Sequence, residues 1–162
     1  MRQPHRRPER LDAGFERFVS VTSPRLLRSA YLLLGDRHDA EDVLQSALMR
    51  TLRRWDAISG SPGAYAFAVL VNLCRDHKRT LRRRPLIGLQ TEVPDGSVSD
   101  LVESALERDA VIQAALRLPR VQREALACRF LLDFSVAETA AALGVPEGTV
   151  KSYTARALAG MR

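Results

Sequence analysis

Cysteine is scarce in this chain, since Cys74 and Cys128 are the only two among 162 residues. Both lie in segments whose apolar residues recur at helical spacing. A disulfide framework or a structural metal site needs several cysteine or histidine ligands at close spacing, so this composition argues against both. We therefore predict two reduced thiols that pack as small apolar side chains, and no metal or other cofactor.

Long apolar runs are also missing. No stretch approaches the roughly 20 apolar residues that a membrane-spanning helix requires. The first residues are rich in arginine, but no apolar core follows them as it would in a secretory signal. Both observations favour a cytoplasmic protein without membrane insertion.

Acidic residues are outnumbered by basic ones, with 19 Asp and Glu against 25 Lys and Arg, and the formal net charge is +6. Such a balance favours a polyanionic partner without identifying it. Aromatic residues make up only 6% of the chain and are not interleaved with the basic residues. That pattern argues against an RNA-binding adaptor, which would use aromatic side chains to stack bases.

The apolar pattern predicts an all-helical protein, because no strand pattern of useful length appears. The first expected helix follows Leu11 and ends near Leu34, with a kink or restart at Pro24. The second follows Gly35, and its apolar stripe is Ala40, Val43, Leu44, Ala47, Leu48, Leu52 and Trp55. A loop over 59–63 precedes a third helix from about Ala64 to Arg83. We expect Trp55 to belong to the core.

A change of composition divides the chain. Residues 86–105 contain no Lys or Arg but four acids, Glu92, Asp95, Asp100 and Glu103. With its glycine, proline and serine residues, this stretch is typical of a linker. We predict a basic tail over 1–10, a helical domain over 11–85, an acidic linker over 86–105 and a second helical domain over 106–162. Helical spacing resumes near Leu101, and Pro119 begins a helix predicted over Arg120–Leu132.

The most informative motif spans residues 135–156. Ser135 and Glu138 have the spacing of a capping box, so a helix should begin at Val136. Gly144 can end that helix in the left-handed conformation, and Pro146 can begin the next one. We expect Val136, Ala140 and Leu143 to share one apolar face, with Ala137, Ala141 and Ala142 allowing close helix packing. In the second helix Val150, Ala157 and Leu158 should face inward, and Lys151, Ser152, Tyr153, Ala155 and Arg156 should face outward.

Two short helices around a glycine turn, the second of them basic, indicate a helix-turn-helix that docks on DNA. An ordinary helical hairpin with a solvated lysine and arginine would show part of this pattern. The combination of capping box, glycine turn and basic second helix favours DNA binding. A nucleic-acid enzyme using the acids of 36–42 with His38 is the rival from another class. No nucleophile, base and metal ligands converge elsewhere in the sequence to support it, and we expect no catalysis.

Three stretches together resemble the extracytoplasmic-function (ECF) group of bacterial sigma-70-type sigma factors, especially its small actinobacterial SigE-like set. The first holds Ala-Tyr-Leu-Leu-Leu-Gly-Asp at 30–36 and Ala-Glu-Asp-Val-Leu-Gln at 40–45. The second runs over 62–84 and includes Asn72, Asp76 and Arg79. The third runs over 118–156 and includes Gly-Thr-Val-Lys-Ser at 148–152. The last motif alone also resembles response-regulator DNA-binding domains, but the three in this order are specific.

The resemblance implies a promoter-specificity subunit of RNA polymerase. Its first domain, region two, would bind the clamp helices of the polymerase beta-prime subunit through Asp39, Asp42, Gln45, Leu48 and Met49. Helix capping alone would equally explain acids in the first turn. The same domain would bind the melted minus-10 strand through Ser59, Gly60, Ser61, Asn72, Arg75 and Arg79. A flexible loop beside a solvated basic helix is the structural alternative there.

In region four, the second domain, the resemblance implies minus-35 recognition by Thr149, Lys151, Ser152, Tyr153, Ala155 and Arg156. The family usually has Arg where this chain has Tyr153, and often a bulkier residue at Ala155, so base preference is open there. The implied partners are core RNA polymerase, including its beta flap, promoter DNA and an anti-sigma factor. A stand-alone helix-turn-helix regulator that binds duplex DNA without polymerase is the alternative. Solvation alone would equally account for the acids of the linker.

Overall fold

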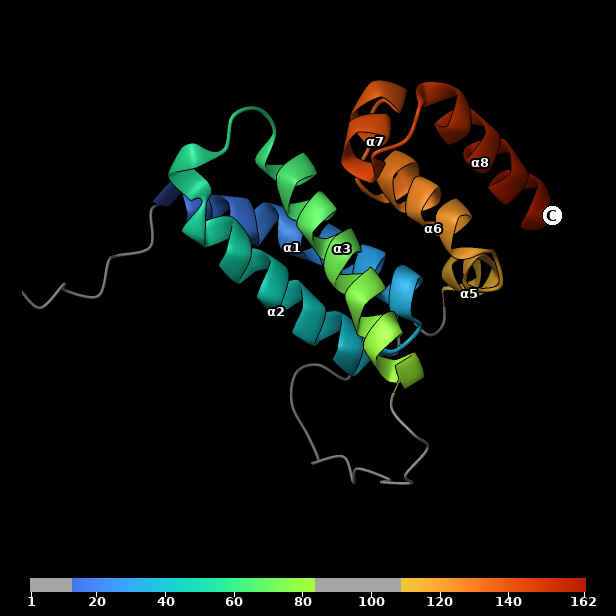
Figure 1. The fold of residues 1–162 in the computed structure, drawn as a ribbon, viewed down its shortest axis with the longest axis horizontal. Coiled ribbons are helices and arrows are strands. Elements are labelled where there is room, and N and C mark those ends of the chain that lie inside the picture. The colour runs from blue at the N-terminus through green and yellow to red at the C-terminus, as the bar shows by residue number, and fades with distance from the viewer. Residues whose placement is uncertain (1–12, 84–108) are drawn as a thin grey trace, which may run out of the picture.

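The computed structural model describes residues 13–83 and 109–162, and this part of the chain is helical without strands (Figure 1). The first bundle contains α1 (Ala13–Leu34), α2 (Arg37–Arg53) and α3 (Pro62–Arg83), with a 3-10 turn over Trp55–Ala57. The second contains α5 (Ala110–Leu116), α6 (Arg120–Leu126), α7 (Val136–Leu143) and α8 (Glu147–Gly160). The all-helical prediction with two bundles is confirmed. The predicted basic tail, the acidic linker and the helical pattern near Leu101 lie outside the described residues.

Local signals explain how α1 and α2 are joined. Gly35 adopts a φ of 76°, which a residue with a side chain rarely takes. Asp36 then caps α2, because its Oδ1 accepts a hydrogen bond of 2.9 Å from the amide of Asp39. The predicted restart of the first helix is wrong: Pro24 lies inside a single continuous α1. Leu26 and Ala30, both fully buried just beyond the proline, supply packing that offsets the hydrogen bond lost at Pro24.

Trp55 closes the end of the first bundle next to the loop that precedes α3. Its ring lies 5.2 Å from the ring of Phe15 and 5.2 Å from that of Phe18, measured between centroids. Trp55 therefore packs against two aromatic rings of α1, but it is half-buried and does not belong to the main apolar cluster, so the predicted core position is only partly correct.

The helix predicted over Arg120–Leu132 is only partly correct. After α6 the backbone widens into a π-helical turn over Ala127–Leu131, and the amide of Leu132 donates to the carbonyl of Ala127 at 3.1 Å. Asp133 then turns the chain with a φ of 56°. This turn directs Phe134 into the core, where its ring stands edge-on to that of Phe67 at 6.0 Å. Tertiary packing outweighed the regular helical pattern.

The helix-turn-helix signals act as predicted at the backbone. The Ser135 hydroxyl accepts from the amide of Glu138 at 3.1 Å, and the Glu138 carboxylate accepts from the amide of Ser135 at 2.7 Å. Gly144 has a φ of 67°, and α8 starts directly after Pro146.

Some faces of these two helices were predicted wrongly. Thr139 and Leu143 are the buried residues of α7, whereas Ala137 and Ala141 are exposed. In α8, Val150 and Ala157 are buried as predicted, but Leu158 is 45% exposed. α7 is short and is contacted by α3, α6 and α8. The spacing of its apolar residues therefore does not predict which of its sides is buried.

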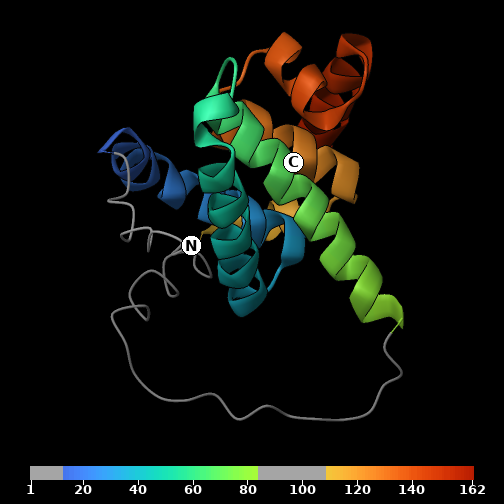
Figure 2. The same cartoon turned by 60° about the vertical axis from the view of Figure 1, so that its left-hand side comes forward.

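The two bundles pack directly on one another (Figures 1 and 2). α1 contacts α5, α6 and the π-helical turn, and α3 contacts α7. Their apolar residues form one continuous core cluster, to which both Phe67 and Phe134 belong. The Arg123 guanidinium donates through Nη1 to the carbonyl of Leu32 at 3.0 Å, joining α6 to the end of α1. We call this arrangement the closed form.

The two thiols are buried as predicted, Cys74 in α3 and Cys128 in the π-helical turn, and both are free. Burial, and to a smaller extent the charge of Glu124, raises the pKa of each thiol to about 12. Neither thiol therefore has the low pKa of a reactive nucleophile. Among residues 13–83 and 109–162, none of the helices combines the length and the apolar character of a membrane-spanning segment.

Candidate nucleic-acid and polymerase surfaces

Helix α8 presents its basic side to solvent. Lys151, Ala155 and Arg156 are exposed, and Thr149, Ser152 and Tyr153 are half-buried. The opposite side packs on α6 and α7, with Val150 and Ala157 fully buried. α8 lies at the edge of the molecule farthest from α2 (Figure 1). The structure thus brings the predicted minus-35 residues together on one helix, half of them fully exposed and half of them partly buried.

The loop before α3 is also accessible. Ser59, Gly60 and Ser61 are exposed, and Gly60 has a φ of 100°. The Ser61 hydroxyl accepts from the amide of Ala64 at 3.2 Å and so caps α3, which accounts for that serine without a ligand. Beside the loop lies a pocket of about 320 Å³, lined by Arg54, Ala57, Ile58, Ser59 and Tyr65.

That pocket adds residues which the sequence had not indicated. Tyr65 offers a ring and Arg54 a guanidinium, the two groups on which nucleic-acid bases stack. Arg54 precedes the loop and Tyr65 follows it in the sequence, and no motif spacing predicts that the two residues meet. Only the turn over Trp55–Ala57 brings them to the same pocket.

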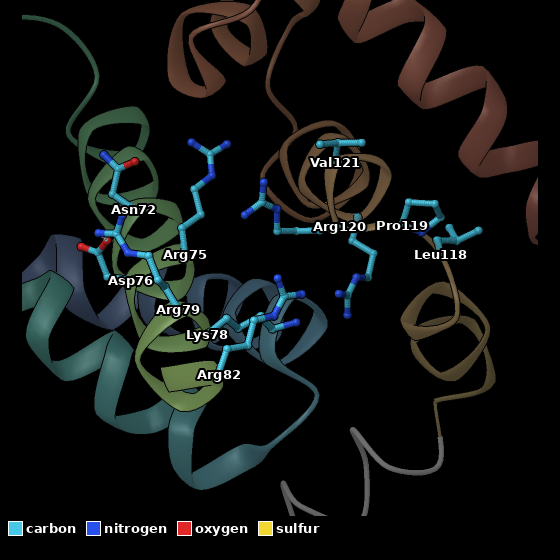
Figure 3. Close-up of a pocket in the computed structure, with 11 residues that line it drawn as sticks. Asn72, Arg75, Asp76, Lys78, Arg79, Arg82, Leu118, Pro119, Arg120 and Val121 are labelled. Carbon is cyan, nitrogen blue, oxygen red and sulfur yellow. Dashed lines mark hydrogen bonds and ion pairs between the residues drawn. The ribbon is translucent and has the colours of Figure 1, made fainter. Parts of the chain in front are cut away.

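The remaining predicted minus-10 residues lie on α3, which faces α6 across a cleft of about 1100 Å³. Figure 3 shows side chains of both helices directed into this cleft. Its basic members are Arg75, Lys78, Arg79, Arg82, Arg120 and Arg123, and Asp76 is the acid among the lining residues. Burial lowers the pKa of Lys78, and the charges of Arg123, Arg120 and Arg82 lower it further. The cleft is strongly cationic because like charges from two bundles converge there.

Within this cleft Asn72 and Arg79 are exposed, but Arg75 is not free. Its Nη2 and Nε donate to the two carboxylate oxygens of Glu124 at 2.7 and 3.1 Å. The side chain of Glu124 is only 3% exposed and that of Arg75 34%. The hydrogen bond to Glu124 raises the pKa of Arg75. Glu124 is a residue that sequence reasoning missed, because it lies in α6 and belongs to no motif.

The predicted polymerase-binding residues on α2 separate into two groups. Asp42, Gln45 and Met49 are exposed at a spacing that places them on one side of the helix, and Leu48 is half-buried. Asp39 instead contacts α3, with its Oδ2 at 2.9 Å from Nε2 of His77. The exposed face of α2 therefore consists mainly of Asp42, Gln45 and Met49. Asp39 is instead engaged by His77 of α3.

A metal centre finds no support in residues 13–83 and 109–162. No three His, Cys, Asp or Glu side chains gather there as a metal site would require. His38, beside the acids at the start of α2, is exposed.

Comparison with known proteins covers both bundles. The family model of Sigma-70 region 2 matches residues 18–84, and that of Sigma-70, region 4 matches residues 108–161. RNA polymerase sigma-E factor of Streptomyces avermitilis is 40% identical over 91% of this chain and 83% of its own length. ECF RNA polymerase sigma factor SigM of Mycobacterium tuberculosis is 37% identical over 90% of this chain and 74% of its own.

Two solved structures share the fold. Sigma factor RpoE of Bartonella quintana, in complex with the anti-sigma factor NepR, has a TM-score of 0.71 at 23% identity, over 93% of this chain and 95% of that one. CnrH, in complex with the cytosolic domain of CnrY, has a TM-score of 0.66 at 21% identity, over 91% and 84%. Taken with the curated relatives, these matches show that the chain belongs to the ECF group of the sigma-70 family of RNA polymerase sigma factors.

Proposed function

We propose that this chain binds core RNA polymerase and directs it to promoters by contacting the minus-35 duplex and the melted minus-10 strand. The observation that carries this proposal is the order of the two sigma-region matches on two bundles, each with an exposed surface of the required chemistry. A duplex-reading helix, a pocket for a single-stranded base and a separate polar face on α2 are three surfaces that a simple DNA-binding regulator would not need together. The chain would have no catalysis of its own and would act in the cytoplasm.

In vitro transcription tests this function directly. Purified protein and core polymerase, incubated with a library of genomic fragments, should produce transcripts whose start sites share a two-element promoter. The protein should also co-elute with core polymerase in size-exclusion chromatography. The rival, a stand-alone helix-turn-helix regulator, predicts tight binding to duplex DNA and no association with polymerase, and that outcome would replace the sigma-factor function.

For the minus-35 element, α8 would enter the major groove with its exposed face. Lys151 and Arg156 would contact phosphates or guanine edges, and Thr149 and Ser152 would add hydroxyl contacts. The side chain of Ala155 would contact bases without hydrogen bonds, and Tyr153 would offer its ring and a single hydroxyl. The base preference is therefore expected to differ from that of relatives with arginine in place of Tyr153 or a bulkier residue in place of Ala155.

Replacing Lys151 or Arg156 with alanine should weaken binding to a minus-35 duplex by about 1–3 kcal/mol. The loss of one phosphate contact would also reduce the slope of log K against log salt by about 0.9. Fluorescence anisotropy at several salt concentrations measures both quantities. Arg117→Ala removes an exposed arginine at the end of α5 and should change neither. Equal effects of all three variants would mean that only net charge matters.

For the minus-10 element, the loop pocket and α3 would act on the melted strand. A base turned out of the stack could enter the 320 Å³ pocket and lie against Tyr65, while Asn72, Arg75 and Arg79 would follow the backbone. Ser59 would line the pocket and Gly60 would allow close approach of the strand. Ser61, which caps α3, would act by placing this loop.

For polymerase, Asp42, Gln45 and Met49 offer an exposed face of mixed polar and apolar character, and Leu48 lies beside it. We propose that this face binds the beta-prime clamp helices and that the second bundle binds the beta flap. Asp39 would orient α2 through His77 and contribute less to the interface. RpoE and CnrH were solved as complexes, and we propose that an anti-sigma factor also controls this chain.

A further inference from the structure

Arg75 has two partners that exclude each other, if the proposed function holds. In the closed form its guanidinium forms a two-pronged ion pair with Glu124 of the second bundle. In the promoter complex the same guanidinium would face a DNA phosphate. A guanidinium whose Nε and Nη2 donors are bound to a carboxylate cannot donate the same hydrogen bonds to a phosphate. Binding the minus-10 strand through Arg75 therefore requires the ion pair to break.

The promoter itself requires the bundles to separate. The minus-35 and minus-10 elements lie about 25 base pairs apart, as their names state, which is about 85 Å along B-form DNA. In the closed form α3 and α7 are in contact, so the two reading surfaces cannot span that distance. Residues 84–108, which join the bundles, have a maximal reach of about 85 Å. The chain is thus long enough to open.

Closure covers the three surfaces unequally. α8 packs on α6 and α7, α2 packs on α1 and α3, and the two helices lie on opposite sides of the molecule (Figure 1). The cationic side of α3, by contrast, lines the cleft against α6 (Figure 3). Of the proposed minus-10 contacts on α3, the closed form occupies Arg75, whereas Asn72 and Arg79 stay exposed.

The positive charges around the cleft make the contact between the two bundles depend on the side chain of Glu124. Lys78 and Arg82 of α3 line the cleft together with Arg120 and Arg123 of α6, and bringing these cations together is unfavourable. Arg79 is instead paired with Asp76 of its own helix at 3.2 Å. Glu124 lies between the two groups: it binds Arg75 and also approaches Nε of Arg120 at 3.5 Å. Without its negative charge, repulsion across the cleft would be opposed by the apolar contacts and by the polar contacts outside the cleft, which include the Arg28–Asp109 ion pair at 2.8 Å and the hydrogen bond from Arg123 to Leu32.

We propose that the Arg75–Glu124 ion pair is an internal lock, in which Glu124 occupies the site of the minus-10 phosphate on Arg75 and holds the bundles closed. Closure and minus-10 binding then compete for one side chain. Partners that separate the bundles, such as polymerase, make Arg75 available, and minus-35 binding by α8 proceeds in either form.

The Glu124→Gln variant tests the lock, since it keeps the shape of the side chain and removes its charge. Its affinity for a single-stranded oligonucleotide carrying the minus-10 sequence, without polymerase, should rise about tenfold. Its radius of gyration from small-angle X-ray scattering should increase, and its affinity for a minus-35 duplex should stay within about twofold of the wild type. Unchanged single-strand affinity would overturn the lock.

Asp133→Asn is the matched control. Asp133 also pairs with an arginine of the first bundle, Arg25, at 3.1 Å, but both side chains are mostly exposed. The substitution removes the same unit of charge from an exposed pair, which contributes little to stability. It should leave single-strand affinity nearly unchanged. Equal gains in Asp133→Asn and Glu124→Gln would attribute the effect to net charge and overturn the lock.

Two further measurements separate the lock from the proposed function. Adding Arg75→Gln to Glu124→Gln should abolish the gain, because the guanidinium that the lock releases is then missing; a gain that persists would contradict the competition for Arg75. In the wild type, saturation with the single strand should increase the radius of gyration, even if Glu124→Gln fails to fold. A protein that transcribes with core polymerase but stays closed on the single strand keeps its function and lacks the lock.

Discussion

Replacing Phe67 with alanine is expected to lower the free energy of unfolding by about 3–5 kcal/mol. Phe67 is fully buried in α3, and its ring packs edge-on against Phe134 across the contact between the bundles. Truncation would leave a cavity that these packed helices cannot close. Urea denaturation followed by circular dichroism measures the loss as a lower midpoint at an unchanged slope.

Phe130→Ala is the control for Phe67→Ala, because it removes the same number of atoms from a side chain that is 56% exposed. Its effect on the free energy of unfolding should stay below about 1 kcal/mol. A similar loss in both variants would mean that Phe67 does not occupy a packed core. Phe67 and Phe134 join the two bundles. A smaller slope of the free energy of unfolding against urea concentration in Phe67→Ala would therefore indicate that the bundles no longer unfold together.

Replacing Asp42, Gln45 and Met49 together with alanine should abolish co-elution with core polymerase and reduce promoter-dependent transcription by about 100-fold or more. A few residues carry most of the free energy of a protein interface, and truncating two of them costs several kcal/mol. All three side chains are exposed, so the fold should be retained. Binding to a minus-35 duplex, which uses α8, should be unchanged.

The control for that variant replaces Glu16, Arg17 and Ser20 with alanine, three exposed positions on α1. It alters a helix surface of similar size and should leave transcription within about twofold of the wild type. Normal transcription by the α2 variant would move the polymerase interface away from this face. Loss of duplex binding in the same variant would instead indicate a damaged fold.

Features that depend on a few neighbouring residues were predictable. The capping box of Ser135 and Glu138 and the left-handed Gly144 follow from local hydrogen bonds and sterics, and the structure has both. The stripe of Ala40, Val43 and Ala47 is buried as its spacing predicts. The outward position of Lys151 and Arg156 follows from the opposite, buried positions of Val150 and Ala157.

Features that depend on distant partners were not predictable. Asp39 looks like a first-turn acid, yet its contact with His77 exists only because α2 and α3 pack side by side. The π-helical turn at Ala127–Leu131 and the burial of Thr139 depend on how α6 and α7 meet their neighbours. Leu158 fits the apolar spacing of α8 but has too little covering it to be buried.

Caps, glycine turns and motifs act over a few residues along the chain, so most helices, the helix-turn-helix and the family could be predicted from the sequence. The packing of the two bundles on each other and the pairing of Glu124 with Arg75 are seen only in the folded protein. An ion pair between residues 49 positions apart depends on how whole helices pack. No local pattern records it, although it bears directly on when the proposed minus-10 surface is free.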